Sequence, residues 1–269
     1  MLVQQASQLD KEKIVEFCKN TFSWGDYIDQ IWDYWISEGN LLVIHENNLA
    51  IAMCHASFNA KNHNLWIEGI RVNPNYRRKK YAKTLVNHCE TIAREKKFKT
   101  TQMLIETTNS NSIFLAKKLG YTNKETWDFY TLDNQTQEKQ STANHLLNLQ
   151  REEFLLNSKL YFVDSWRWFA LTKDSISKLS QENRIIFSEN NDTINGIAIF
   201  TESQHFENTV IVTLLMGDDS GIENLLSKIL SISKQKNFKR IQILTKLKNL
   251  PKQIGLEKKL TFHLFEKNL

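Results

Sequence analysis

The stretch 66–82 most constrains the fold of this 269-residue chain, because it reads as a strand, a sharp turn and the start of a helix. Apolar and β-branched residues favour a strand up to Val72, and Pro74 ends it because proline lacks the N–H that a sheet requires. Apolar side chains then recur at helical spacing from Ala82 onward. The sequence therefore places the basic run 77–80 on the first turn of a helix.

This basic run is an unfavourable choice at a helix N-terminus, which already carries about half a positive charge. An anion would compensate the charge, and free backbone N–H groups together with positive side chains form a phosphate site at such a position. A solvated basic patch is the alternative that composition alone supports. The run consists of Arg77, Arg78, Lys79 and Lys80.

The hydrophobic strand, the V-x-P turn and the pattern Arg77-x-x-Lys80-x-Ala82 resemble the R/Q-x-x-G-x-G/A signature of the GCN5-related N-acetyltransferases. Arg77 and Ala82 match that signature, whereas Lys80 stands where the family usually has glycine. In that family these residues hold the pyrophosphate of acetyl-CoA, and the backbone of the strand end pairs with pantetheine. The resemblance thus implies a coenzyme site formed by Ile70, Arg71, Val72, Arg77, Arg78, Lys79, Lys80, Tyr81 and Ala82.

The expected order of elements in the first half also resembles that family. The order is β, α, α, β, β, β, α, β, α, β, which predicts an α/β fold with a mixed sheet and flanking helices. Asn47 and Asn48 indicate a hairpin turn, and Gly69 permits a bulge or a close ligand approach. By resemblance, the strand before the basic turn and the strand after the helix splay apart, and the acyl thioester lies in the gap.

The second half repeats features of the first, which predicts two tandem domains of the acetyltransferase type. The segment around Phe238 matches the segment around Phe98, and the same offset aligns Gln242 with Gln102. Gly217 to Ile222 replaces the basic turn with two aspartates, which would repel a pyrophosphate, so we expect the second copy to be degenerate. The predicted boundaries are 1–133 for the acetyltransferase domain, 134–158 for a linker and helix, and 159–269 for the degenerate domain.

Transfer of an acetyl group to an amine benefits from a base, because an amine with a pKa of about 10.4 is mostly charged at neutral pH. We assign this role to Glu68, which precedes Gly69 beside the expected thioester; an ordinary carboxylate paired to a lysine across the strands is the equal alternative. A backbone N–H at the bulge would polarise the carbonyl. Ala116 stands where many family members carry the tyrosine that reprotonates the thiolate, and Tyr81 and Tyr121 are candidate substitutes.

The sequence allows more than one role for each of three further features. Asn109 matches an asparagine that opens the family's next helix and contacts the coenzyme, or it is a plain N-cap. The aromatic segment 22–35 forms core or a wall of the acceptor cleft. Trp166 and Trp168 alternate, so we expect them on one side of a strand, as core, interface or acceptor contact.

The leading prediction is an acetyl-CoA-dependent N-acetyltransferase that acts on a primary amine: a free amino acid, a peptide N-terminus or a lysine side chain. Gly25 to Tyr27 and the run EGIRV-x-P are similar to the group that contains histidine N-acetyltransferases. The alternative is a non-catalytic sensor or regulatory module that binds acyl-CoA, which Lys80 and Ala116 favour. A nucleic-acid module ranks last, because the net charge of +5 is mild and the lysines are scattered.

Composition bounds the remaining expectations. No window approaches the ~18 consecutive apolar residues of a membrane span, and the N-terminus lacks a signal-peptide core, so we expect a cytoplasmic protein. Cys18, Cys54 and Cys89 have no metal or redox spacing, and the histidines form no ligand motif, which predicts reduced thiols and no metal. Acetyl-CoA serves as the acyl donor, the amine is the expected partner, and a homodimer is one expected assembly.

Overall fold

The computed structural model describes residues 2–22, 25–59, 63–136, 140–191, 193–252 and 255–269. Its internal contacts divide the chain into two compact units. The first unit comprises Met1–Glu125 together with His263–Leu269, and the second comprises Thr126–Phe262.

The first unit has the predicted order of elements, which is thereby confirmed. Its sheet follows the order β1-β2-β3-β4-β5-β13-β6. The pairings from β1 to β4 are antiparallel, whereas β4 and β5 run parallel. The elements are β1 (Val3–Gln5), α1 (Lys11–Cys18), α2 (Ile28–Glu38), β2 (Leu41–Glu46), β3 (Leu49–Asn59), β4 (Asn64–Val72), α3 (Tyr81–Glu95), β5 (Thr100–Glu106), α4 (Ser110–Lys118) and the start of β6 (Thr122–Leu132).

Local sequence explains the boundaries of several of these elements. Asn47 and Asn48 have φ angles of 51° and 63°, which asparagine tolerates better than most residues and which closes the predicted hairpin between β2 and β3. Gly39, with φ of 84°, ends α2. A short 3-10 turn, Pro74–Tyr76, follows β4, because proline cannot continue a sheet.

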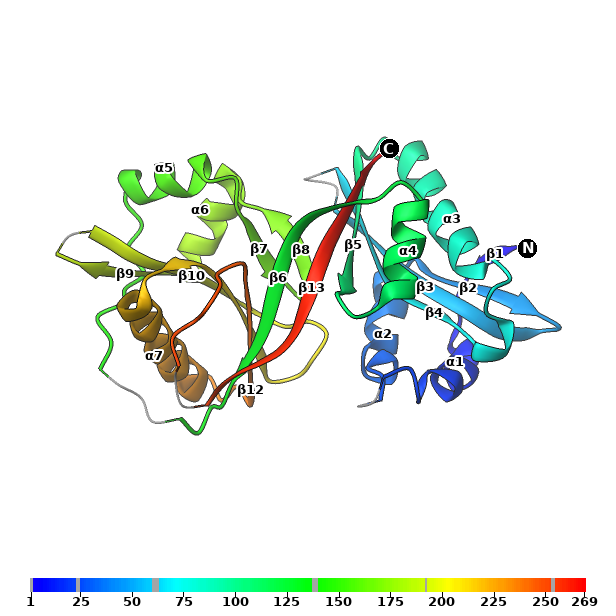
Figure 1. Ribbon diagram of the computed structural model, residues 1–269, viewed down its shortest axis with the longest axis horizontal. Coiled ribbons are helices and arrows are strands. Elements are labelled where there is room, and N and C mark those ends of the chain that lie inside the picture. Colours follow the sequence, from blue (N-terminus) through cyan, green and yellow to red (C-terminus); the bar gives the residue numbers. More distant parts are fainter. Residues whose placement is uncertain (1, 23–24, 60–62, 137–139, 192, 253–254) are drawn as a thin grey trace. The chain divides into compact units, whose positions relative to one another are not determined.

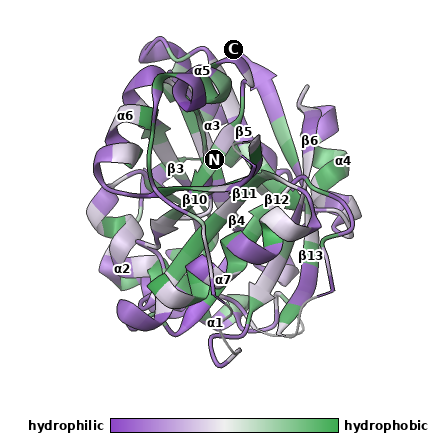
Figure 2. Ribbon diagram, turned by 90° about the vertical axis from the view of Figure 1, so that its left-hand side faces the viewer, coloured by the Kyte–Doolittle hydropathy of each residue, from purple (hydrophilic) through white to green (hydrophobic). Residues whose placement is uncertain are grey.

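One core cluster of the first unit lies between the sheet and α3. Leu85, Val86 and Cys89 of the helix pack in one buried cluster with Leu65 and Ile67 of β4. In Figure 2 the hydrophobic colour concentrates on strands such as β3 and β4. On α2, three apolar side chains are almost fully buried, which confirms the core reading for them: Ile31, Trp32 and Trp35.

The second unit repeats the first. Phe98 N donates to Ala93 O at 2.9 Å, and Phe238 N donates to Ser233 O at the same distance, so the helix-to-strand turns match at the predicted offset. The residue before each phenylalanine also has a left-handed φ. The elements are α5 (Leu149–Asn157), β7 (Tyr161–Asp164), β8 (Arg167–Ala170), α6 (Lys173–Gln181), β9 (Ile185–Asn190), β10 (Thr193–Glu202), β11 (Thr209–Gly217), α7 (Asp219–Gln235), β12 (Arg240–Thr245) and the start of β13 (Leu256–Asn268).

The aromatic segment 161–172 corrects one expectation. It forms a hairpin, β7 and β8, instead of a single strand, because Ser165 and Trp166 adopt left-handed φ angles of 49° and 61° and turn the chain. Trp166 therefore lies in the turn, where its ring packs against Phe129, while Trp168 is buried on β8 against Trp127. The two tryptophans do not share one strand, and both contribute to aromatic packing within the second unit.

The closing strands β6 and β13 each belong to both units. Residues 122–125 of β6 lie in the first unit, whereas residues 126–132 lie in the second, where they pair with β12. β13 runs the other way, from the second unit into the first, and it lies beside β6 (Figure 1, green and red). The end of the chain, 263–269, is therefore part of the first unit, which the sequence boundaries 1–133 and 159–269 do not anticipate.

Specific contacts hold the end of β13 in the first unit. Phe265 is fully buried in the cluster between sheet and α3. Gln102 of β5 donates to the Glu266 carboxylate at 2.8 Å. The Lys267 ammonium lies 2.7 and 2.9 Å from the two oxygens of Glu90, a buried residue of α3. This end of the chain thus supplies both apolar and charged packing to the first unit.

Candidate functional site

The site begins where β4 and β5 separate. Within the described part of the chain, the two strands pair at three positions: Asn64 with Thr100, Leu65 with Thr101 and Trp66 with Gln102. Both strands continue beyond this point, β4 to Val72 and β5 to Glu106. Their backbones therefore diverge, and the edge of β4 after Trp66 is open to an extended ligand that could pair with it. The expected splay is present in the first unit.

A bulge lies in the diverging part of β4. His55 pairs with Glu68, and Met53 pairs with Arg71, so that two residues, Gly69 and Ile70, stand opposite one residue of β3. Gly69 has a φ of 63°, and a Cβ atom there would lie 2.4 Å from the ring of Trp35. The predicted bulge is thus confirmed, and both the backbone angle and the tryptophan require glycine.

Glu68 lies directly before the bulge, and its side chain is 11% exposed. One carboxylate oxygen lies 2.9 Å from Nδ1 of His55, its neighbour across the strands. The other oxygen accepts a hydrogen bond of 3.1 Å from the indole N–H of Trp66. The cross-strand partner of Glu68 is therefore a histidine instead of the lysine that the alternative reading required.

The basic run forms the turn that leads into α3. All four side chains are exposed, and the helix begins only at Tyr81, so the run precedes the first helical turn instead of lying on it. Lys80 is the N-cap and makes no side-chain capping bond, so the cap residue leaves the first N–H groups of α3 to other acceptors. Positive side chains and a positive helix end thus meet at one place, as an anion site requires.

Lys80 adopts the backbone conformation that glycine would favour. Its φ is 68°, and that of Arg78 is 67°, so the turn contains two left-handed non-glycine residues. Position 80 therefore has a left-handed backbone angle that glycine adopts readily, although the residue is a lysine. Within the turn, the Lys79 ammonium lies 5.0 Å from the centre of the Tyr76 ring, and Arg77 Nε donates to Val72 O at 3.3 Å.

Two of the expected coenzyme residues can contribute only through their backbone. The Arg71 guanidinium makes a two-point ion pair with Asp26, at 2.7 and 3.1 Å, and it also covers the rings of Phe22 and Tyr27. Tyr81 is buried, and its hydroxyl donates to the Glu46 carboxylate. The side chain of Arg71 thus fixes the segment before α2 to β4, and that of Tyr81 fixes the start of α3 to β2.

The two tyrosines considered as proton donors are already engaged. The hydrogen bond to Glu46 raises the pKa of Tyr81. Tyr121 accepts a hydrogen bond from Thr101 at 2.8 Å, and burial raises the pKa of its hydroxyl. Ala116, at the usual tyrosine position, is 1% exposed in the core cluster. These three positions therefore offer no accessible acid in this conformation.

Asn109 lies at the start of α4, just beyond the end of β5. Its side-chain oxygen accepts a hydrogen bond from Ser112 N at 3.1 Å, so the N-cap reading is confirmed. The cap uses the oxygen only, which leaves the amide N–H₂ group as the part that could meet a coenzyme. The coenzyme role of Asn109 remains a prediction.

The corresponding place in the second unit is closed. β11 and β12 pair at six consecutive positions, from Thr209 with Arg240 to Leu214 with Thr245, so no comparable splay opens between these described strands. Asp218 caps α7 and accepts from Gly221 N at 2.7 Å. A Cβ atom on Gly221 would lie 2.0 Å from Asn195 O, which shows how closely the helix start packs on β10. The helix end is thus neutralised by the chain itself.

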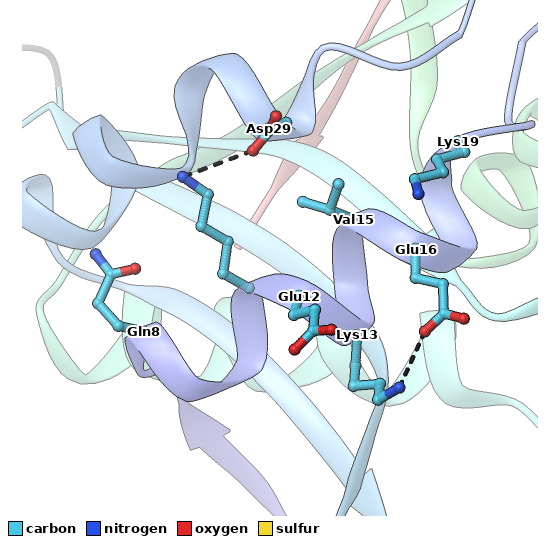
Figure 3. Close-up of a pocket in the computed structure, with 8 residues that line it drawn as sticks. Gln8, Glu12, Lys13, Val15, Glu16, Lys19 and Asp29 are labelled. Atoms are coloured by element: carbon cyan, nitrogen blue, oxygen red, sulfur yellow. Dashed lines mark hydrogen bonds and ion pairs between the residues drawn. The ribbon is translucent and has the colours of Figure 1, made fainter.

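Other parts of the described structure do not add to this site. Figure 3 shows a surface pocket along α1 in which Lys11 pairs with Asp29 at 3.6 Å and Lys13 with Glu16 at 3.1 Å. The pocket contains none of the predicted site residues. Among the residues that the structure describes, no three His, Cys, Asp or Glu side chains are grouped to hold a metal, and no helix is long and apolar enough to cross a membrane.

Sequence reasoning missed two side chains at this site, His55 and Asp26. His55 lacks any motif with its neighbours, and Asp26 is distant along the chain from Arg71. The sequence could have indicated one of them, because Asp26 belongs to the Gly25–Tyr27 run that carried a family resemblance. Nothing in the sequence marks His55.

Comparison with known proteins agrees with the geometry. Residues 11–121 match the family model described as "Acetyltransferase (GNAT) family". A GCN5-related N-acetyltransferase from Sphaerobacter thermophilus superimposes with a TM-score of 0.67 at 12% identity, covering 99% of this chain and 95% of that one. A tandem GNAT protein from the clavulanic acid biosynthesis pathway gives 0.58 at 8% identity, covering 99% and 98%. At such identities these structures show a shared fold alone. No curated protein matches the chain in sequence.

Proposed function

Since residues 11–121 match the family model of the GNAT acetyltransferases, we propose that this chain transfers an acetyl group from acetyl-CoA to a primary amine. The observation that carries the proposal is the divergence of β4 from β5 at a bulge, followed directly by the basic turn and the start of α3. The diverging strand offers an open edge with backbone donors, and the basic turn with the start of α3 offers an anion site.

The acyl donor would be held by both backbone and charge. The backbone of Ile70, Arg71 and Val72 lies on the diverging strand, where the amide groups of pantetheine can pair with its open edge. The pyrophosphate would lie at the start of α3, where the N–H groups of Tyr81 and Ala82 point along the helix axis. Around it stand the exposed side chains of Arg77, Arg78, Lys79 and Lys80, with Asn109 as a further contact.

The reaction needs a neutral amine, and Glu68 is the carboxylate beside the bulge. It would take a proton from the acceptor, after which the amine nitrogen bonds to the thioester carbon and the C–S bond breaks. A backbone N–H at Gly69 or Ile70 would stabilise the charge that develops on the carbonyl oxygen. The departing thiolate has a pKa of about 8.5 and can take its proton from water, so no tyrosine is needed.

The acceptor is proposed as a class only. A free amino acid, a peptide N-terminus and a lysine side chain all present a primary amine, and the histidine N-acetyltransferase-like group is the narrowest resemblance. Trp66 donates to Glu68, and the ring of Trp35 touches the bulge, so indole rings lie close to the proposed base. A non-catalytic acyl-CoA sensor is the second candidate, supported by the buried Ala116 at the tyrosine position.

Coenzyme binding and turnover test the proposal together. Coenzyme A at about 100 times its Kd should stabilise the chain by about 2.7 kcal/mol, seen as a rise in Tm. Charge reversal at Arg77 and Arg78 to Glu should remove most of that rise. The matched control reverses Lys96 and Lys97, two exposed residues at the far end of α3, which changes net charge equally.

Free thiol released from acetyl-CoA with a panel of amines would distinguish the two candidates. Release that depends on an added amine supports the transferase. Tight coenzyme binding without release for any amine class would instead favour the sensor. An equal loss of the Tm shift in both charge-reversed variants would place the coenzyme away from the basic turn.

A further inference from the structure

His55 is a buried histidine that the reaction outlined above does not use. It lies on β3 with no exposed surface. Both ring nitrogens meet oxygen atoms: Nδ1 lies 2.9 Å from Glu68 Oε1, and Nε2 lies 2.9 Å from the carbonyl oxygen of Gly39. A carboxylate oxygen accepts hydrogen bonds, so the ring donates to the proposed base when Nδ1 carries a proton.

Trp35 holds this imidazole from the side of α2. The indole and imidazole rings stack with centroids 4.8 Å apart and an angle of 6° between their planes. The same indole contacts the bulge, since a Cβ atom on Gly69 would lie 2.4 and 2.5 Å from two of its ring atoms. One buried side chain of α2 therefore touches both the histidine that meets Glu68 and the backbone turn that follows Glu68.

We propose that His55, clamped by Trp35, is a positioning residue that fixes the Glu68 carboxylate for proton transfer from the acceptor amine. This inference rests on the proposed function of Glu68 as base. A glutamate has several rotatable side-chain bonds, and here His55 holds one oxygen while Trp66 holds the other. Each carboxylate oxygen can accept more than one hydrogen bond, so such anchoring leaves room for an incoming amine. Anchored orientation is what a base requires.

The titratable groups around the imidazole support a role beyond packing. Glu68 faces Nδ1 from β4, and the Glu38 carboxylate from the end of α2 lies 3.6 Å from Nε2. Burial raises the pKa of the nearby Tyr27, and the charge of Glu68 raises it further, so this hydroxyl stays neutral. A donor on Nδ1 stabilises the ionised form of Glu68. If that donor is lost, Glu68 takes up a proton at higher pH, and the acid side of the rate profile shifts upward.

Two substitutions of His55 test the proposal. His55→Phe keeps a flat ring for Trp35 but removes the donor, and kcat should fall about 10- to 100-fold, with the acid side of the pH profile moved to higher pH. His55→Gln keeps an N–H donor and should recover part of that loss. The Tm rise caused by coenzyme A should stay unchanged in both. His45→Phe is the matched control. His45 lies on β2 and pairs with Asp10 at 2.7 Å, away from Glu68, so this substitution should leave the kinetics unchanged.

A double variant separates this inference from the function on which it rests. If His55 acts through Glu68, His55→Phe should cost nothing further in a Glu68→Gln chain. Additive losses, or a normal rate and pH profile for His55→Phe beside a slow Glu68→Gln, would overturn the role of His55 alone. A normal Glu68→Gln would overturn the base itself.

A spectroscopic measurement covers the case in which the His55 variants fold poorly. In the unchanged chain, ¹⁵N-edited NMR of the histidine rings should show a protected Nδ1 proton on His55. That signal should move or vanish in Glu68→Gln and stay unchanged in His45→Phe. An unchanged His55 signal in the Glu68→Gln variant would refute the hydrogen bond on which the proposal depends.

Discussion

Replacement of Phe265 by alanine tests the claim that the end of the chain completes the first unit. Phe265 is fully buried in the cluster between the sheet and α3. A buried phenylalanine replaced by alanine typically costs about 3–5 kcal/mol, because both transfer energy and packing are lost. For a unit of this size, the Tm for the unfolding of the first unit should fall by roughly 10–20 °C.

The control and the location of the effect make the test decisive. Phe114 on α4 belongs to the same unit but is 68% exposed, so Phe114→Ala should cost under about 0.5 kcal/mol. Hydrogen exchange followed by mass spectrometry should show faster exchange in α3 and β5 for Phe265→Ala, with β10 little changed. Equal stabilities of the two variants, or faster exchange in the second unit alone, would show that residues 263–269 do not belong to the first core.

Two further predictions concern the second unit. Backbone and side-chain donors at the start of α7, Gly221 N foremost, lower the pKa of Asp218. Its stabilising effect is therefore complete above the unfolded pKa of about 3.9 and is lost as pH falls through the folded value. Asp218→Ala should lower Tm at pH 7 more than at pH 3. Asp219 does not form the cap, so the loss of Tm in Asp219→Ala should depend less on pH. Because this helix end is capped and β12 pairs with β11 along its whole length, calorimetry should find one coenzyme A per chain; two equivalent sites would contradict the asymmetry.

Short-range sequence signals predicted much of the first unit. Pro74 marks the end of β4, the paired asparagines mark the hairpin before β3, and Gly69 marks the bulge. Each feature depends on the backbone preference of one or two residues, which the sequence states directly. The repeat that aligns Phe238 with Phe98 likewise needs only local similarity, and the matching turns before β5 and β12 confirm it.

The contacts that arrange the site depend on distant pairing, which local preference does not encode. His55 meets Glu68 only because β3 and β4 pair in one register, and a single bulge shifts every later pair by one residue. Arg71 reads as a coenzyme residue by its position, yet its side chain turns to Asp26. A lysine at position 80 is chemically unlike the usual glycine, while its backbone keeps the left-handed angle.

β6 and β13 each contribute residues to both units, and this arrangement affects how the protein folds during synthesis. The residues that complete the first unit, 263–269, are synthesised only after the whole of 126–262 has been translated. At about 5–20 residues per second, the unfinished first unit waits on the order of 10 s for its final strand. During that interval the edge of β5 lacks its β13 neighbour and is open to other chains.

The same arrangement ties the second half to the first. A stop codon anywhere before residue 263 would remove the strand that carries Phe265 and Lys267 from the unit that holds the proposed site. Loss of the second half would therefore impair the first, even though Asp218 of the second half already caps its own helix. A copy whose helix start is capped by its own side chain can in this way remain indispensable to the copy that carries the proposed site.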